Sequence, residues 1–199
     1  AKDSCRSDSY TWGGTVSVLD PGVNTLTLAP TSGPSKNATW VAADGMYSAS
    51  FTGAADAFTS DSSWTLQAMG GGYPNVNVPA FGQTAGRPNL TSPSIGGGSY
   101  PRVSRYQTFT WSGVTADWIL ITMSVWNSNG SGYESAVSCV VNNDGNFSFD
   151  GSQFSSWPTN RQVDVEFGAV REATGDMEWD NSESRMVGIY AIYGAGLSQ

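Results

Sequence analysis

Apolar and polar residues alternate over many short stretches of this chain. Residues 15–19 alternate, Asp20-Pro21-Gly22 follows, and residues 24–28 alternate again. Alternation of period 2 sends successive side chains to opposite faces of a strand, which suits a strand with one buried face. Pro presets one backbone angle and Gly tolerates a positive one, so Asp-Pro-Gly marks a turn. The pattern predicts a β-hairpin at this end of the chain.

Similar stretches recur along the rest of the sequence. They are residues 39–43, 46–51, 64–69, 76–81, 106–111, 117–126, 135–141, 146–149, 162–171 and 185–193. We expect residues 39–43 and 46–51 to form a hairpin across Asp44-Gly45, and residues 135–141 and 146–149 to form another. Residues 153–157 fit one helical turn, and no amphipathic helix longer than about two turns is found. Roughly twelve short strands between turn signals predict an all-β fold. We expect an antiparallel β-sandwich or a jelly-roll-like arrangement, with little or no helix.

One stretch breaks the alternation and divides the chain. Residues 83–103 hold three prolines and a triple glycine. Proline cannot donate to the hydrogen bonds of a sheet and glycine weakens a strand, so this stretch predicts a connection with at most one edge strand, near Leu90. We therefore expect two β-subdomains, an N-terminal one over residues 1–82 and a C-terminal β-sandwich over residues 104–199.

Charge and composition exclude several classes of function. The chain has no histidine, which excludes Ser-His-Asp and Cys-His catalysis and any imidazole metal site. Its formal net charge is −8, from 17 acidic and 9 basic residues, so nucleic acids and anionic membranes would be repelled. No apolar run approaches the roughly 18 residues that a membrane-spanning helix needs. We expect neither nucleic-acid binding nor membrane insertion.

Only 13% of the residues are charged, and serine, threonine, asparagine and glycine are abundant. This composition is typical of exported β-proteins, and Ala1 opens a polar stretch rather than a signal peptide. We expect a mature chain that is secreted or lies at the cell surface. Cys5 and Cys139 are its two cysteines, and in an exported chain such a pair usually forms a disulfide. The alternative is two unpaired thiols, with Cys139 a small buried residue of a strand.

Paired carboxylates are the first candidates for chemistry. Small secreted jelly-roll glycosidases have about this length and composition, and they use two carboxylates across a cleft. Glu134 and Glu178 are the best candidates for catalytic residues, because each lies beside an aromatic residue that could stack on a sugar. The alternative is that both are solvated loop charges. The strand motifs around the catalytic glutamates of those enzymes do not match here, which favours a protein that is not an enzyme.

The segment 172–183 concentrates five carboxylates between two strands. Oxygen-rich loops can hold calcium, which takes six to eight oxygen ligands, and Asp176, Glu178 and Asp180 would be its ligands here. The alternative, a solvated acidic hairpin loop, is favoured. We expect no metal or other cofactor, with calcium as the one possibility that the sequence leaves open.

The eight tryptophans divide into two groups. Three of them occur in strand-like stretches and are expected in the core, namely Trp64, Trp111 and Trp118. Others lie near loops or strand ends, where an indole ring could stack on a ligand. Among these, the candidates for ligand stacking are Trp126, Trp157 and Trp179.

Several short phrases occur together in a fixed order. They are Asp44-Gly45-Met46-Tyr47-Ser48-Ala49-Ser50-Phe51, Val78-Pro79-Ala80-Phe81, Leu90-Thr91-Ser92-Pro93, Thr108-Phe109-Thr110-Trp111-Ser112-Gly113, Ser138-Cys139 with Asn143-Asp144-Gly145-Asn146-Phe147, and Gly168-Ala169-Val170-Arg171. Over about residues 44–171 this order is similar to that of uncharacterised β-sandwich proteins and lipoproteins of the bacterial cell envelope. The resemblance implies a β-sandwich in the envelope. It assigns no activity, so no functional residue is carried over from it.

Together these observations favour an exported, non-enzymatic β-sandwich protein with a structural or adhesive role at the bacterial cell surface. Its partners would be proteins or glycans. The alternative is a carbohydrate-binding module or a small glycosidase. The tail, residues 194–199, suggests self-association, because a glycine-containing end is usually frayed unless a strand of another chain, or its own domain, holds it.

Overall fold

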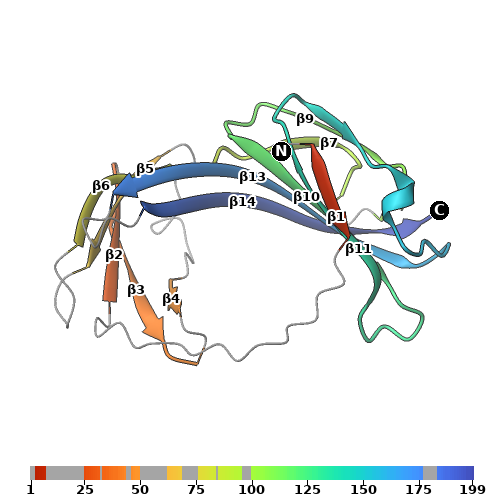
Figure 1. The fold of residues 1–199 in the computed structure, drawn as a ribbon, viewed down its shortest axis with the longest axis horizontal. Coiled ribbons are helices and arrows are strands. Elements are labelled where there is room, and N and C mark those ends of the chain that lie inside the picture. Colours follow the sequence, from red (N-terminus) through yellow and green to blue (C-terminus); the bar gives the residue numbers. More distant parts are fainter. Residues whose placement is uncertain are drawn as a thin grey trace. The chain divides into compact units, whose positions relative to one another are not determined.

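The computed structural model describes residues 3–7, 25–31, 33–43, 46–49, 62–68, 76–83, 85–95, 100–176 and 183–199. Within these residues the secondary structure consists of fourteen β-strands and one 3-10 turn, so the predicted all-β fold is confirmed (Figure 1). The elements are β1 (Ser4–Ser7), β2 (Thr25–Pro30), β3 (Lys36–Val41), β4 (Met46–Ser48), β5 (Ser63–Ala68), β6 (Val76–Gln83), β7 (Asn89–Ser92), β8 (Arg102–Val103), β9 (Thr108–Ser112), β10 (Trp118–Trp126), β11 (Tyr133–Val141), β12 (Asn146–Ser148), η2 (Gly151–Gln153), β13 (Gln162–Asp176) and β14 (Glu183–Ser198).

The strands form three sheets in two compact units. The first unit takes residues 1–11, 85–170 and 189–199, and the second takes residues 12–84 and 171–188. A six-stranded sheet has the order β1-β11-β10-β13-β14-β8, and a three-stranded sheet has the order β12-β9-β7. A five-stranded sheet, β4-β3-β2-β5-β6, belongs to the second unit. The long strands β13 and β14 are neighbours, and each contributes residues to both units (Figure 1).

The core of the first unit follows from strict alternation along β10. Its residues Ile119, Ile121, Met123 and Val125 are fully buried, whereas the residues between them face the other side of the sheet. The two neighbouring strands keep the same register, so that Cys139 of β11 and Phe167 of β13 both lie opposite Ile121. Because paired residues point to the same face, three strands together present one continuous apolar surface.

The three-stranded sheet covers that apolar surface. Phe109 of β9 stacks on Phe167 with ring centroids 6.4 Å apart, and Trp111 contacts the same ring at 5.3 Å. The Trp111 indole N–H also donates to Asn143 Oδ1 at 2.9 Å, so its polar atom is satisfied inside the core. Two sheets therefore pack face to face in the first unit, as a β-sandwich requires. The core position predicted for Trp111 is confirmed, whereas Trp118 is only half-buried.

The predicted hairpin between residues 135–141 and 146–149 is wrong. Strand β11 has β1 on one side and β10 on the other, and β12 pairs with β9 in the second sheet of the sandwich. Both edges of β11 are thus occupied, and the chain crosses between the sheets at Asn143. The amide group of Asn143 donates to the carbonyl oxygens of Val114 and Ala116 at 3.0 and 3.1 Å, which fixes this crossing.

The tail of the chain is held by its own domain. Leu197 and Ser198 of β14 pair in parallel with β8, which makes the six-stranded sheet mixed rather than purely antiparallel. The Ser198 N–H donates to the Arg161 carbonyl at 2.8 Å, and the Gln199 N–H donates to the Val103 carbonyl at 3.0 Å. The tail thus docks along the same chain, which is one of the two explanations expected for its order.

The second unit contains an antiparallel meander. Strands β2 and β3 pair from Thr25↔Thr39 to Leu28↔Lys36, and the predicted pairing of residues 39–43 with residues 46–51 is realised by β3 and β4. Trp64 and Leu66 of β5 are buried here, which confirms the core position predicted for Trp64. The predicted strand at residues 15–19 lies outside the described residues. No helix in the described part of the chain is long and apolar enough to cross a membrane.

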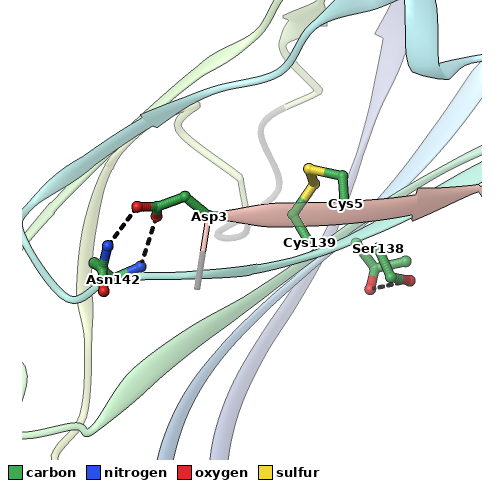
Figure 2. Close-up of a disulfide and its surroundings, with 6 residues drawn as sticks. Asp3, Cys5, Ser138, Cys139 and Asn142 are labelled. Atoms are coloured by element: carbon green, nitrogen blue, oxygen red, sulfur yellow. Dashed lines mark hydrogen bonds between the residues drawn. A yellow bond between two sulfur atoms is a disulfide. The ribbon is translucent and has the colours of Figure 1, made fainter. Parts of the chain in front are cut away.

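The predicted disulfide between Cys5 and Cys139 is confirmed (Figure 2). The two cysteines lie directly opposite each other on β1 and β11, and the bond spans a sequence separation of 134 residues. Beside it, both carboxylate oxygens of Asp3 accept hydrogen bonds from Asn142, one of them from the backbone N–H at 2.9 Å. The N-terminal segment is thereby attached to the sandwich. A disulfide indicates an oxidising, non-cytoplasmic location for the chain.

Removal of the disulfide should destabilise the first unit. In the Cys5→Ser/Cys139→Ser variant we expect the free energy of unfolding to fall by about 2–5 kcal/mol, because the unfolded chain loses a long-range constraint. Chemical denaturation of both proteins measures this difference. Mass spectrometry should find a gain of two hydrogens on reduction of the wild type. Two thiols that react with an alkylating reagent before reduction would contradict the bond.

A second prediction concerns the close approach of β14 to β8. A Cβ atom at Gly196 would lie 2.5 Å from the Pro101 carbonyl oxygen and 2.7 Å from Val103 Cγ2. Gly196→Ala should therefore destabilise the protein by about 1–3 kcal/mol, as overpacking does. Gly132→Ala is the matched control, since a Cβ there would lie 3.9 Å from Asn127 Nδ2. Equal midpoints for the two variants in thermal unfolding would contradict the tight packing of the tail.

Candidate functional site

The face of the six-stranded sheet that points away from the core carries polar side chains at its centre. The register pairs Thr122 of β10 with Glu166 of β13, and Ser124 with Asp164. These residues alternate with the buried core positions of the same strands, so all four side chains point to the same face. We call this the outer face. Two hydroxyls and two carboxylates therefore lie together in the middle of a sheet whose opposite face is packed.

A pocket of about 410 Å³ lies on the outer face. We call it the outer-face pocket, and its lining residues are Thr122, Ser124, Tyr133, Asp164, Val165, Glu166, Tyr193, Gly194 and Ala195. They come from β10, β11, β13 and β14, which are consecutive in the sheet in the order β11-β10-β13-β14. All of them belong to the first unit. Strands rather than loops build the pocket, and strands hold side chains in more defined positions.

Asp164 organises one side of the outer-face pocket. Its Oδ2 atom accepts hydrogen bonds from the Trp126 indole N–H at 2.6 Å and from the Tyr133 hydroxyl at 3.0 Å. Its Oδ1 atom accepts a hydrogen bond from the Gln162 side chain at 2.7 Å. The Trp126 and Tyr133 rings also contact each other edge to face, with centroids 4.9 Å apart. Both oxygens of Asp164 are thus engaged by protein side chains, and Oδ2 orients the aromatic pair.

Glu166 has a different environment. Its Oε1 atom accepts a hydrogen bond from the Tyr193 hydroxyl at 3.0 Å, whereas its Oε2 atom accepts none from the described residues. Tyr193 and Tyr133 are 68% and 53% exposed, so their rings are available to a ligand. They stand on β14 and β11, which are three strand spacings apart across the sheet. An elongated ligand could contact both rings while lying over the carboxylates.

Ser124 adds a hydroxyl group to the outer-face pocket. Its side chain lines the outer-face pocket, and the residue is only 7% exposed. Its hydroxyl makes no hydrogen bond with any of the described residues. The Ser124 oxygen is not among the buried polar atoms without a partner in the described residues, so it keeps contact with solvent in the pocket. A ligand hydroxyl could exchange a hydrogen bond with it in place of water.

The carboxylates also affect the two tyrosines. Burial raises the pKa of Tyr133 above its ordinary value of 10.0, and the hydrogen bond to Asp164 raises it further. For Tyr193 the hydrogen bond to Glu166 is the main cause of a raised pKa, followed by burial. In both cases the neutral phenol is favoured, because a phenolate beside a carboxylate would be repelled. Both hydroxyls therefore remain hydrogen-bond donors to the carboxylates at neutral pH.

The residues predicted from the sequence as site candidates have diverse surroundings. Trp126 is half-buried at the border of the outer-face pocket, where it supports Tyr133 and Asp164. Trp157 packs edge-on against Phe154 of the core, with its indole N–H on the Gln199 carbonyl at 3.1 Å. Neither tryptophan is among the residues that line the pocket.

The carboxylates predicted from the sequence do not come together with those of the outer-face pocket. Glu134 is exposed, accepts a hydrogen bond from the Ser156 hydroxyl at 2.6 Å and does not line the pocket. Glu178, Trp179 and Asp180 lie outside the described residues, as does the side chain of Asp176. Among the described residues there is no group of three or more carboxylates and cysteines that could hold a metal ion.

Sequence reasoning missed Asp164, Glu166 and Tyr193. A signal for the two carboxylates was present, because Val163, Asp164, Val165 and Glu166 alternate and so predict carboxylates on the face opposite the core. Tyr193 carried no such signal. Its proximity to Glu166 depends on the pairing of β13 with β14, and no local pattern reports that pairing.

No family model, curated protein or solved structure matches this chain. The similarity to envelope β-sandwich proteins thus stays a prediction from the sequence. What the protein does must be inferred from the outer-face pocket itself.

The raised pKa values of the two tyrosines can be tested separately. At pH 10 an ordinary tyrosine is half ionised, and we expect Tyr133 and Tyr193 to be mostly neutral there. Asp164→Asn should lower the pKa of Tyr133 and leave that of Tyr193 unchanged, whereas Glu166→Gln should do the reverse. NMR of ¹³Cζ-labelled tyrosine resolves the two titrations, with Tyr→Phe variants for assignment.

The sign of the linked stability change follows from the raised pKa values. The stabilisation from the two phenol hydrogen bonds is present in full below pH 10 and is lost as the pH rises through the higher folded-state pKa values. Denaturation at pH 10 and above should therefore reveal a decline that is smaller in Tyr193→Phe. A lower than ordinary pKa at either tyrosine would contradict the hydrogen bonds.

Proposed function

We propose that this chain is an exported, non-enzymatic protein of the bacterial cell surface or extracellular space that binds glycans in the outer-face pocket. One observation carries the proposal. Two exposed tyrosines and two carboxylates converge from neighbouring strands on one pocket, together with the hydroxyls of Thr122 and Ser124. An adhesive role at the surface would follow from such binding.

The chemistry of the pocket suits a saccharide. A sugar ring has apolar C–H faces, which pack on aromatic rings such as those of Tyr133 and Tyr193. Around its rim it has hydroxyls, which donate to carboxylates and exchange hydrogen bonds with serine and threonine. The volume of about 410 Å³ is within the ordinary range for small-ligand sites. The oxidising location that the disulfide indicates is where proteins meet surface glycans.

The arrangement of the carboxylates favours binding over hydrolysis. A glycosidase needs two carboxyl groups that flank the scissile bond, one of which donates a proton while the other attacks or activates water. Asp164 and Glu166 stand two residues apart on one strand and point to the same face. Both oxygens of Asp164 are engaged by neighbouring side chains. A substrate lying over them would have both carboxylates on one side.

Self-assembly receives less support than glycan binding. Its motive in the sequence was the glycine-containing tail, and the hydrogen bonds of residues 197–199 are made within the chain. Protein contacts at the cell surface remain compatible with this fold. They lack a feature as definite as the outer-face pocket.

We expect the protein to bind at least one neutral hexasaccharide from a panel of cellohexaose, mannohexaose and N-acetylchitohexaose. Isothermal titration calorimetry measures the binding. Tyr193→Ala should weaken it about tenfold, because a stacking surface is lost. Tyr100→Ala is the control, since Tyr100 is also exposed, at 51%, but lies outside the pocket. No reducing sugar should be released from any of the three.

Ser124→Ala makes a sharper test of the same proposal. The variant should bind the same saccharide several-fold more weakly, yet it should be about as stable as the wild type, because the hydroxyl makes no hydrogen bond with the described residues and remains in contact with solvent. Thermal unfolding with and without the saccharide measures both effects. Absence of binding across the panel, or hydrolysis that Asp164→Asn or Glu166→Gln abolishes, would contradict the proposal.

A further inference from the structure

We infer that the outer-face pocket selects uncharged saccharides and rejects acidic ones, and that Glu166 is the residue responsible for this selection. The inference rests on the proposed function and names the class of glycan that the pocket takes.

The charged side chains that line the outer-face pocket are all negative. Its nine lining residues include two carboxylates, Asp164 and Glu166, and neither a lysine nor an arginine. The nearest arginine in the same row of the sheet is Arg6 on β1, which lies level with Ser138, Thr122 and Glu166. Three strand spacings separate it from Glu166, or roughly 14 Å between backbones. A ligand bound over β10 and β13 therefore lies closer to the two carboxylates than to Arg6.

The two carboxylates contribute differently to recognition. Asp164 accepts three hydrogen bonds from protein side chains, so it acts as a positioning residue for Trp126 and Tyr133. Glu166 keeps Oε2 without a hydrogen bond from the described residues. This oxygen can accept a hydrogen bond from a ligand, and a saccharide hydroxyl can donate one. Ser124 lies two residues along β10 from Thr122, the residue that pairs with Glu166, so its hydroxyl is on the same face of the sheet.

A ligand that carries a carboxylate next to Glu166 would bind more weakly. It has no proton to donate to Glu166 Oε2 at neutral pH, and it brings a second negative charge into a partly enclosed site. Repulsion between like charges a few ångströms apart is larger there than in bulk water. A uronic acid at this position should bind at least about tenfold more weakly than the corresponding neutral sugar, a difference in the range that one such interaction provides.

The test compares one saccharide chain in a neutral form and in an acidic form. The hexasaccharide that binds most tightly in the neutral panel is compared with the same chain oxidised at C6 to uronic acids, by calorimetry at pH 7 and about 0.15 M salt, where long-range charge effects are screened. We expect the wild type to prefer the neutral chain at least about tenfold. Glu166→Gln should reduce this preference to about twofold or less, mainly through stronger binding of the oxidised chain.

Glu134→Gln is the matched control, because it removes the same net charge from an exposed carboxylate of β11 that does not line the pocket. It should leave the preference unchanged. Equal loss of preference in both variants would overturn the inference in favour of an effect of total charge. Equal binding of the two chains by the wild type would overturn the selectivity alone, and glycan binding would stand. Failure of every saccharide to bind would overturn the proposed function and the inference together.

Discussion

The register between β10 and β13 is the constraint on which the rest of the first unit depends. The same pairing that sets Ile121 opposite Phe167 in the core sets Thr122 opposite Glu166 on the outer face. Because side chains alternate with period 2, a slip of one residue would bury Asp164 and Glu166 and expose Val163 and Val165. The apolar face therefore fixes the geometry of the polar face. The outer-face pocket needs no separate folding information, since the core specifies its position.

The two edge strands of the six-stranded sheet are short. β1 has four residues and is attached through the disulfide, and β8 has two residues and is attached to the tail. Short edge strands offer little backbone for pairing with another chain, which is how natural sheets avoid aggregation. The disulfide also joins positions that are 134 residues apart, so it links the start of the chain to the central strands.

Local patterns predicted the strands but not their partners. Alternation and turn residues located β2, β5 and β10 well, because a strand with one buried face needs that pattern, whereas β13 and β14 each continue five residues past their predicted ends. The pairing of β12 with β9 escaped prediction, since the Asn-Asp-Gly turn before β12 looks like a hairpin turn. Only the side chain of Asn143, which bonds to the Val114 and Ala116 carbonyls, reveals that the chain changes sheets there.

The candidate site was less predictable than the fold for a related reason. The sequence drew attention to Glu134 and Glu178, because each neighbours an aromatic residue along the chain. In a sheet, however, the neighbours that matter are across strands. Asp164 is flanked by two valines in sequence, and its aromatic partners Trp126 and Tyr133 come from β10 and β11.

The division of roles between the two carboxylates follows from which strands flank β13. On one side β10 and β11 bring the donors of Trp126 and Tyr133, and these engage Asp164. On the other side β14 brings the hydroxyl of Tyr193, and the second oxygen of Glu166 accepts no hydrogen bond from the described residues. A carboxylate held by several donors is a rigid support, whereas a carboxylate with an open oxygen can accept from a ligand. Support and recognition are thus separated by two residues on a single strand, and it is the asymmetry of the sheet around β13 that separates them.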